Sequence, residues 1–190
     1  YAAGLAVSSF NLPLWPAVLL ALVAGGALAC ATGVAILRLR GHYLALATLC
    51  LGIILFEVIN QLDNFNLARE IYGLPTLGLF GWTPDTPLAR VYLIWGIVLL
   101  VVVWSVHLTE SPVGRALRAI HGDEDAAESL GVNVFALKLK VFIASGVLAA
   151  LAGVLYAFVY TPDYLGPEEF GLMCSVTLLT MVVIGGMGSI

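Results

Sequence analysis

The chain has 190 residues, of which 61% are hydrophobic and only 11% are charged, and its mean hydropathy is +1.03. Soluble domains are typically about 45–50% apolar and about 25% charged, so this composition indicates a membrane protein. The formal net charge is −4, with 8 Lys and Arg against 12 Asp and Glu. Nucleic-acid partners are disfavoured because phosphate binding needs clustered basic residues. The three cysteines have no Cys or His at metal-ligand spacing, so we expect neither a disulfide framework nor a metal site.

Five apolar segments are candidates for membrane-spanning helices, which need roughly 20 apolar residues. We expect an all-α integral membrane protein, a polytopic helix bundle in which residues 1–190 form one transmembrane domain. Because the chain does not open with Met and ends within an apolar stretch, we also expect it to be an internal piece of a larger protein. The first expected span begins near Pro16 and ends near Leu37. The second, third and fourth run from His42 to Ile59, from Val91 to Val106 and from Val134 to Tyr160, and the fifth begins near Gly171.

The basic residues are distributed unevenly between the connections. The connections at 60–90 and 161–170 hold only Arg69 and Arg90. The positive-inside rule therefore predicts that the 107–133 loop is cytoplasmic and that the 60–90 loop is external. The other connections, together with the entry to the fourth span, hold Arg38, Arg40, Arg115, Arg118, Lys138 and Lys140.

The 107–133 loop is longer than a simple connection between two helices, which is about 2–8 residues. Ser111 followed by Pro112 predicts a helix start, and Gly122 predicts its end. The acidic residues at 123–125 favour the start of a second short helix, which Gly131 is placed to stop.

The first of these short helices is predicted to be amphipathic. Two interpretations are open: a hairpin lying on the lipid headgroups, or a docking surface for a cytoplasmic protein. Its apolar face consists of Val113, Ala116, Leu117 and Ile120, and Arg115 and Arg118 fall outside that face.

Small residues recur at four-residue spacing in two of the spans. One stripe comprises Gly25, Ala29 and Gly33, and the other comprises Ala149, Gly153 and Ala157. Such stripes allow helix backbones to approach closely, although glycine and alanine are also common in all membrane helices.

A few residues are candidates for a substrate pathway. Glu57 lies near the external end of the second span, where a carboxylate serves either as an interfacial anchor or in a pore, and Asn60 has the same alternatives. The glycines near the end of the chain indicate either an unwound segment or close helix packing; they are Gly185, Gly186 and Gly188.

The 107–133 loop also carries a recognisable pattern. Asp125-Ala126-Ala127, followed by Gly131 after three intervening residues, resembles the EAA…G signature of ABC-transporter permeases, with Asp in place of Glu. The longer run over 111–120, with Asp123-Glu124 and Gly131-Val132-Asn133, resembles the branched-chain amino-acid permeases of the LivM type. Further matches lie at residues 37–49 and 183–190.

The resemblance implies a pore-forming permease subunit that imports leucine, isoleucine or valine across a bacterial inner membrane. It also implies a second permease subunit, cytoplasmic ATP-binding subunits and an extracytoplasmic substrate-binding protein as partners, and no cofactor. The chain has no G-x-x-x-x-G-K-[ST] phosphate loop, so we expect it to be no enzyme and to leave ATP hydrolysis to a partner. The residues implied in coupling to that ATPase are Ser111, Pro112, Val113, Gly114, Arg115, Leu117, Arg118, Ile120, Glu124, Asp125, Ala126, Ala127, Glu128 and Gly131.

Two other functions compete with this hypothesis. A urea or amide permease of the same wider family would carry a similar coupling loop, so the loop cannot distinguish the two substrates. A secondary transporter is disfavoured, because ion coupling usually needs acidic or polar residues at mid-membrane and no carboxylate lies at the centre of a predicted span.

Overall fold

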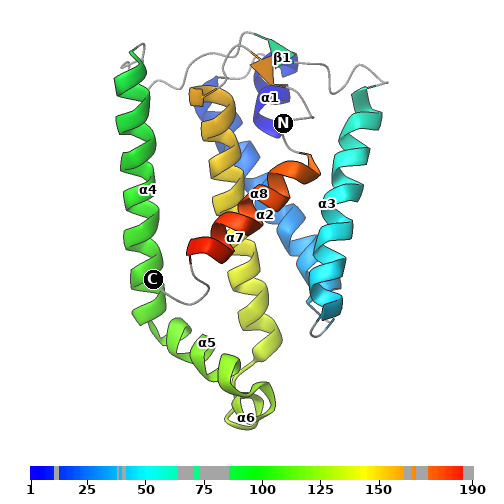
Figure 1. Cartoon of the computed structure of the whole chain (residues 1–190), viewed down its shortest axis with the longest axis vertical. Coiled ribbons are helices and arrows are strands. Elements are labelled where there is room, and N and C mark those ends of the chain that lie inside the picture. The colour runs from blue at the N-terminus through cyan, green and yellow to red at the C-terminus, as the bar shows by residue number, and fades with distance from the viewer. Residues whose placement is uncertain are drawn as a thin grey trace. The chain divides into compact units, whose positions relative to one another are not determined.

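The computed structural model describes residues 1–10, 13–37, 39, 42–63, 71–72, 86–160, 164–165 and 171–185 (Figure 1). Its helices are α1 (Ala2–Phe10), α2 (Leu14–Ile36), α3 (His42–Asp63), α4 (Pro87–Glu110), α5 (Pro112–Gly122), α6 (Glu124–Ser129), α7 (Val134–Leu155), the π-helix η1 (Tyr156–Tyr160) and α8 (Leu172–Gly185). Two short strands, β1 (Ile71–Tyr72) and β2 (Tyr164–Leu165), pair antiparallel with Ile71 opposite Leu165. The expected class, an all-α multi-pass membrane protein, is confirmed apart from this short β-pair.

Three helices in the described part of the chain are long and apolar enough to cross a membrane: Leu14–Ile36, Pro87–Glu110 and Val134–Tyr160. They correspond to the first, third and fourth predicted spans. The 24 residues of α4 extend about 36 Å, which exceeds the roughly 30 Å of a bilayer's hydrocarbon core. The second and fifth predicted spans correspond to α3 and α8, whose apolar stretches among the described residues are shorter. The count of five spans therefore stays a prediction.

The N-terminal apolar segment forms two helices, and the sequence pattern does not predict the first of them. α1 ends at Phe10, and α2 begins at Leu14, two residues before the predicted start at Pro16. Pro13 immediately precedes α2, and Pro16 is the third residue of that helix. A proline in the first turn is tolerated because the N–H groups there have no intrahelical partner.

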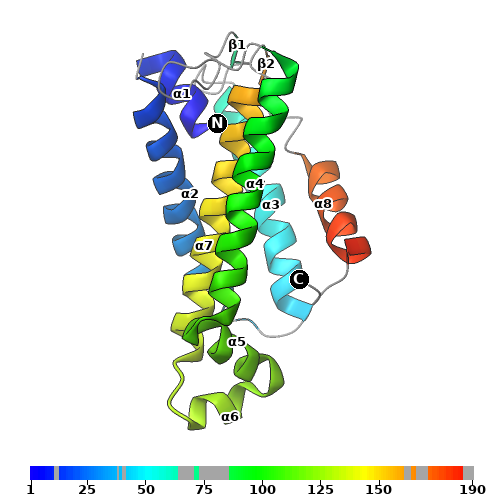
Figure 2. The same ribbon diagram turned by 90° about the vertical axis from the view of Figure 1, so that its left-hand side faces the viewer.

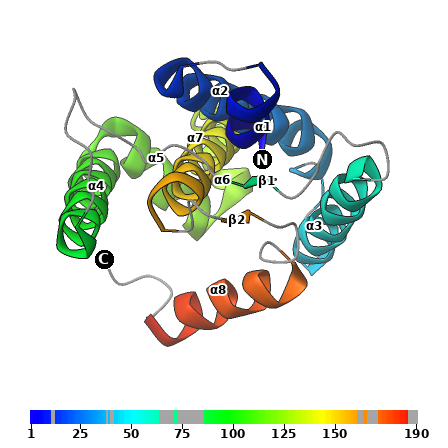
Figure 3. The same cartoon turned by 90° about the horizontal axis from the view of Figure 1, so that it is seen from above.

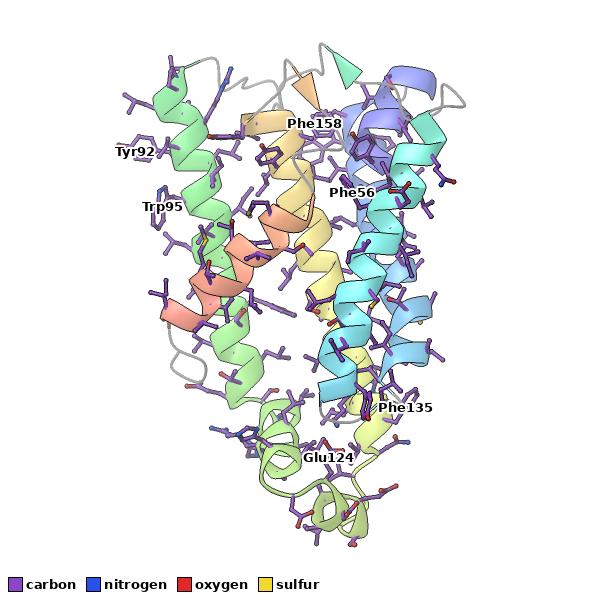
Figure 4. The ribbon with its side chains drawn as sticks, turned by 45° about the vertical axis from the view of Figure 1, so that its right-hand side comes forward. Phe56, Tyr92, Trp95, Glu124, Phe135 and Phe158 are labelled. Carbon is purple, nitrogen blue, oxygen red and sulfur yellow. The ribbon has the colours of Figure 1, made fainter. Side chains whose placement is uncertain are left out.

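The chain divides into two compact units. The first comprises Tyr1–Ala21, Leu39–Leu77 and Gly153–Ile190. Its core includes Phe158 and Val159, which have the largest fully buried side chains among the described residues. Both belong to η1, whose widened turn buries three consecutive residues; Phe158 is labelled in Figure 4. The other buried apolar residues that the structure describes in this unit are Ala3, Ala6, Ala17, Ala21, Val154 and Ala157.

The second unit comprises Leu22–Arg38 and Gly78–Ala152, and in it α2 packs closely against α7. A Cβ atom added to Gly25 would lie 2.5 Å from the Cβ of Ala150, and one added to Gly146 would overlap the Cβ of Ala29. Small residues on both helices therefore let the two backbones approach, as in other membrane helix pairs.

The predicted stripe on α2 thus forms a packing surface, whereas Ala149 and Gly153 of the second predicted stripe do not face it. The third residue of that stripe, Ala157, lies in η1 and is buried. Ala149 is exposed, and a Cβ on Gly153 would meet no described atom within 4 Å. The contact is made instead by Gly146 and Ala150. Because α7 carries small residues at four-residue spacing on more than one face, the spacing alone could not identify the face that meets α2.

The fully described helix α4 has a mostly exposed surface, with Leu93 as its one buried residue. Tyr92 is 75% exposed and Trp95 is 62% exposed, and both project away from the ribbon in Figure 4. A helix that is apolar on all sides and exposed on most of them is typical of a membrane span in contact with lipid.

Replacing Gly146 with valine is expected to destabilise the α2–α7 packing, because the added side chain would overlap Ala29. Gly153→Val, on the same helix but with open space at the Cβ position, is the matched control. Overpacking costs about 1–3 kcal/mol. We expect the Tm of the purified protein in detergent to fall by several degrees for G146V and to stay nearly constant for G153V. Equal melting temperatures would contradict this packing.

Candidate functional site

α4 and α5 meet at Ser111, which ends one helix and begins the next (Figure 2). Its N–H donates to the carbonyls of His107 at 3.1 Å and Leu108 at 3.3 Å. Its hydroxyl donates to the Leu108 carbonyl at 2.6 Å and accepts from the Gly114 N–H at 3.4 Å. Pro112 occupies the first helical position, where no N–H is needed. The helix start predicted at Ser111 and Pro112 is confirmed.

Gly114 is buried where α5 turns back against the last turn of α4. A Cβ atom at this position would overlap the backbone of Thr109 and lie 2.6 Å from its α-carbon. Backbone atoms cannot swing aside as a flexible side chain can. Glycine is therefore required by the close approach of the two helices.

Arg115 and Arg118 reach back from α5 to the end of α4. Arg115 Nη1 donates to the Glu110 carbonyl at 3.3 Å, and Arg118 Nη2 donates to the Thr109 carbonyl at 3.2 Å. Carbonyl groups in the last turn of a helix lack intrahelical partners, and the helix dipole favours cations there. Both arginines thus stabilise the junction between α4 and α5 by hydrogen bonds within the chain. That they also orient a partner protein stays a prediction.

The apolar face of α5 is turned toward the chain itself. Ile120 is only 6% exposed, and Val113, Ala116 and Leu117 are half-buried. Burial of this face attaches α5 to the rest of its unit, so Ile120 offers no surface to a partner.

The start of α6 is capped by Asp123. Its Oδ1 accepts from the Asp125 N–H at 2.9 Å and from the Ala126 N–H at 3.1 Å. These two hydrogen bonds satisfy backbone donors that lack partners at a helix start. The acidic cluster at 123–125 therefore begins the second short helix, as predicted.

α6 ends in a Schellman motif at Gly131, which has a φ of +85°. The Gly131 N–H donates to the Glu128 carbonyl at 2.9 Å, and the Val132 N–H donates to the Ala127 carbonyl at 3.1 Å. Glycine suits this left-handed position because it lacks a Cβ. The stop predicted at Gly131 is confirmed.

An ion pair joins α6 to the first turns of α7. Lys138 Nζ lies 2.5 Å from Glu124 Oε1, and their side chains are 30% and 39% exposed; Glu124 is labelled in Figure 4. At this exposure the pair contributes about 0.2–1 kcal/mol, so its main effect is to hold α6 in position. α7 itself is capped by Asn133, whose Oδ1 accepts from the Ala136 N–H at 2.9 Å.

The opposite side of α6 is open to solvent. Leu130 is 82% exposed, although it is a large apolar residue. The described chain does not cover Leu130, so this side of the segment is accessible to a partner. We name this surface the α6 outer face, and it consists of Asp125, Ala126, Glu128, Ser129 and Leu130.

A pocket of about 430 Å³ lies between α3 and the start of α8, both in the first unit. The ribbon in Figure 3 shows the start of α8 beside α3. Glu57, the candidate for a substrate pathway, is part of its wall. The α3 residues in this wall follow two rows at four-residue spacing, so they share one side of the helix. The lining consists of Thr48, Leu49, Gly52, Ile53, Phe56, Glu57, Gly171 and Ser175.

The other candidates for the substrate pathway are not among the described residues that line this pocket. Asn60 lies in α3, but its side chain is outside the described residues, as are Gly186 and Gly188 entirely. Gly185 is the last residue of α8, and a Cβ there would meet no described atom within 4 Å. The role of all four in a pathway stays a prediction.

Comparison with known proteins assigns the family. The family model described as "Branched-chain amino acid transport system / permease component" matches residues 1–190. The chain belongs to this permease family. It is 32% identical over 204 residues to the high-affinity branched-chain amino acid transport system permease protein LivM of Salmonella typhimurium, and equally to LivM of Escherichia coli K12. Each match covers 95% of this chain and 48% of the relative.

Relatives named for other substrates also match this permease. The ribose import permease protein RbsC of Escherichia coli K12 is 32% identical over 142 residues, covering 73% of this chain and 43% of RbsC. The nucleoside ABC transporter permease protein NupC of Lactococcus lactis is 27% identical over 157 residues, covering 75% of this chain and 48% of NupC. The chain spans about half the length of the curated relatives that it matches. No solved structure matches it.

Sequence reasoning missed several residues that the structure places at the two candidate sites. The sequence indicates no role for Lys138 beyond its charge, and it does not single out Thr109. Thr48 and Ser175 lie in the pocket wall with Glu57. The four-residue spacing of Thr48, Gly52 and Phe56 would predict that they share one side of α3. Nothing in the sequence predicts that α3 lies next to α8.

Replacing Gly114 with alanine in the permease is expected to open the α4–α5 corner, because the added Cβ cannot coexist with the Thr109 backbone. Gly122→Ala, in the same helix with open space at the Cβ position, is the control. We expect amide hydrogen exchange in α5 to accelerate about tenfold or more for G114A, and to be unchanged or slower for G122A. Unchanged exchange in G114A would contradict the assigned close approach.

Exchanging the charges of Glu124 and Lys138 distinguishes an ion pair within the chain from a contact between Glu124 and a partner protein. Glu124→Lys alone places two ammonium groups together and is expected to impair transport. The double variant Glu124→Lys with Lys138→Glu restores the pair within the chain and is expected to recover transport. Failure of the double variant to recover, measured as substrate uptake at equal membrane abundance, would contradict a role for this ion pair within the chain.

Proposed function

We propose that the chain forms part of the translocation pore of an ATP-driven importer of branched-chain amino acids in a bacterial inner membrane. The observation that carries this proposal is the match to two LivM proteins over 95% of the chain. The names of RbsC and NupC as import and ABC transporter permeases support the same transporter class with other solutes.

The energy for transport is proposed to come from separate ATPase subunits that dock on the α6 outer face. The chain has no phosphate loop, so ATP-driven movement must reach it through contact. α5 and α6 are attached to α4 through Ser111 and to α7 through Glu124. A displacement of α6 would therefore be passed to two membrane-spanning helices.

The remaining partners follow from this mechanism and from the charge distribution. The basic residues in and just after α5–α6 are more numerous than those in the connections at 60–90 and 161–170, which favours a cytoplasmic location for this segment. An extracytoplasmic binding protein would then deliver the solute on the side of the 60–90 loop. A second permease subunit would complete the pore.

Uptake of labelled leucine by cells that carry or lack the intact gene tests the substrate. We expect uptake to be lost on deletion, and isoleucine and valine to compete with leucine. Urea, ribose and a nucleoside serve as controls for related permeases. Unchanged leucine uptake together with lost uptake of urea, ribose or the nucleoside would replace the proposed substrate.

Placing a charge on the α6 outer face tests the ATPase contact. Leu130→Glu is expected to reduce ATP-driven leucine uptake tenfold or more, because it puts a carboxylate into an interface that buries an apolar side chain. Leu39→Glu is the control, since Leu39 is 43% exposed and lies in another predicted cytoplasmic connection. Equal uptake by the two variants at equal membrane abundance would argue against docking at Leu130.

A further inference from the structure

The pocket between α3 and α8 has walls of two kinds. Leu49, Ile53 and Phe56 provide an apolar wall, and Phe56 is labelled on α3 in Figure 4. Glu57 and Ser175 provide a carboxylate and a hydroxyl group. Pockets for small molecules measure about 300–1,000 Å³ and combine apolar walls with a few polar groups. At about 430 Å³, this pocket suits a small amphipathic solute.

Among the described residues that line the pocket, Glu57 is the one with a charged side chain. Among the described residues, none forms an ion pair or hydrogen bond with its carboxylate. It lies six residues before the end of α3, which is about 9 Å along the helix axis. The Glu57 side chain is exposed, and its place in the pocket wall makes its carboxylate accessible to a cation that enters the pocket.

We propose that this pocket binds a small solute that has a primary ammonium group and an aliphatic side chain. Glu57 accepts the ammonium group, and Leu49, Ile53 and Phe56 contact the aliphatic part. This inference rests on the proposed function, since it makes the transported amino acid the ligand. The Ser175 hydroxyl is available to the solute's carboxylate from the opposite wall.

The same chemistry disfavours the other solutes carried by the wider family. Urea and ribose have no positive charge to pair with Glu57, and their many polar groups would lie against an apolar wall without hydrogen-bond partners. Unpaired polar groups of this kind cost affinity. The pocket therefore selects for an aliphatic amino acid within the proposed class of importer.

Three substitutions change the pocket in different ways. Glu57→Gln removes the charge and keeps the shape, while Glu57→Asp keeps the charge. Gly52→Leu fills the pocket, because a Cβ at Gly52 meets no described atom within 4 Å. Gly96→Leu is its matched control: Gly96 is also a glycine with open space in an apolar helix, and it is not part of the lining.

The experiment measures initial rates of labelled leucine uptake by the complete transporter in cells, at equal membrane abundance. We expect E57Q and G52L each to lower the rate about tenfold or more. We expect E57D to retain at least a third of the rate and G96L to stay within twofold of the unmodified protein. Rates near the unmodified value for both E57Q and G52L would overturn the inference. If the unmodified transporter itself takes up no leucine, it is the proposed function that fails.

An aminophospholipid headgroup presents the same ammonium group as an amino acid. Reconstitution of the complete transporter in phosphatidylglycerol vesicles removes that source. A tenfold effect of E57Q that persists in these vesicles supports binding of the free amino acid. An effect that disappears there would overturn it in favour of a lipid headgroup.

Discussion

Where a membrane helix ends, its last backbone carbonyls need hydrogen-bond partners, and in this chain the next segment provides them. Inside the bilayer a helix satisfies its own backbone, so its unpaired carbonyls are concentrated in the last turn. In α4 these carbonyls accept hydrogen bonds from Ser111, Arg115 and Arg118 of the next segment. The groups that end the membrane helix are thus the groups that begin and orient α5. This sharing fixes the direction of the chain where it leaves the span.

A continuous series of local contacts then links α4 to α7. Asp123 caps α6, the turn at Gly131 closes it, and Glu124 pairs with Lys138 of α7. α7 in turn packs against α2 through small residues within the second unit. Each contact is modest in energy, but together they leave α6 few ways to move without its neighbours. If an ATPase subunit moves α6, as we propose, this rigidity would pass the movement on to α4 and α7.

The features that depend on neighbouring residues are the ones that the sequence predicts. Helix caps act over three or four positions, so Ser111, Asp123 and Gly131 can be assigned their roles from the order of residues alone. Contacts between distant residues cannot be assigned in this way. Glu124 and Lys138 are 14 residues apart, the partners of Gly25 lie on α7, and the pocket joins α3 to α8. The arginines show the same limit, because their charge is evident in the sequence while their carbonyl partners on α4 are not.

The proposed contact between the α6 outer face and an ATPase subunit can be tested at Leu130. Site-specific photo-crosslinking from position 130 of the complete transporter tests it most directly, because Leu130 is 82% exposed and a probe there disturbs little of the described chain. We expect a crosslinked adduct between this chain and the ATPase subunit, with a yield that changes when ATP is added. No adduct from position 130, with adducts to the ATPase from position 39 instead, would contradict it.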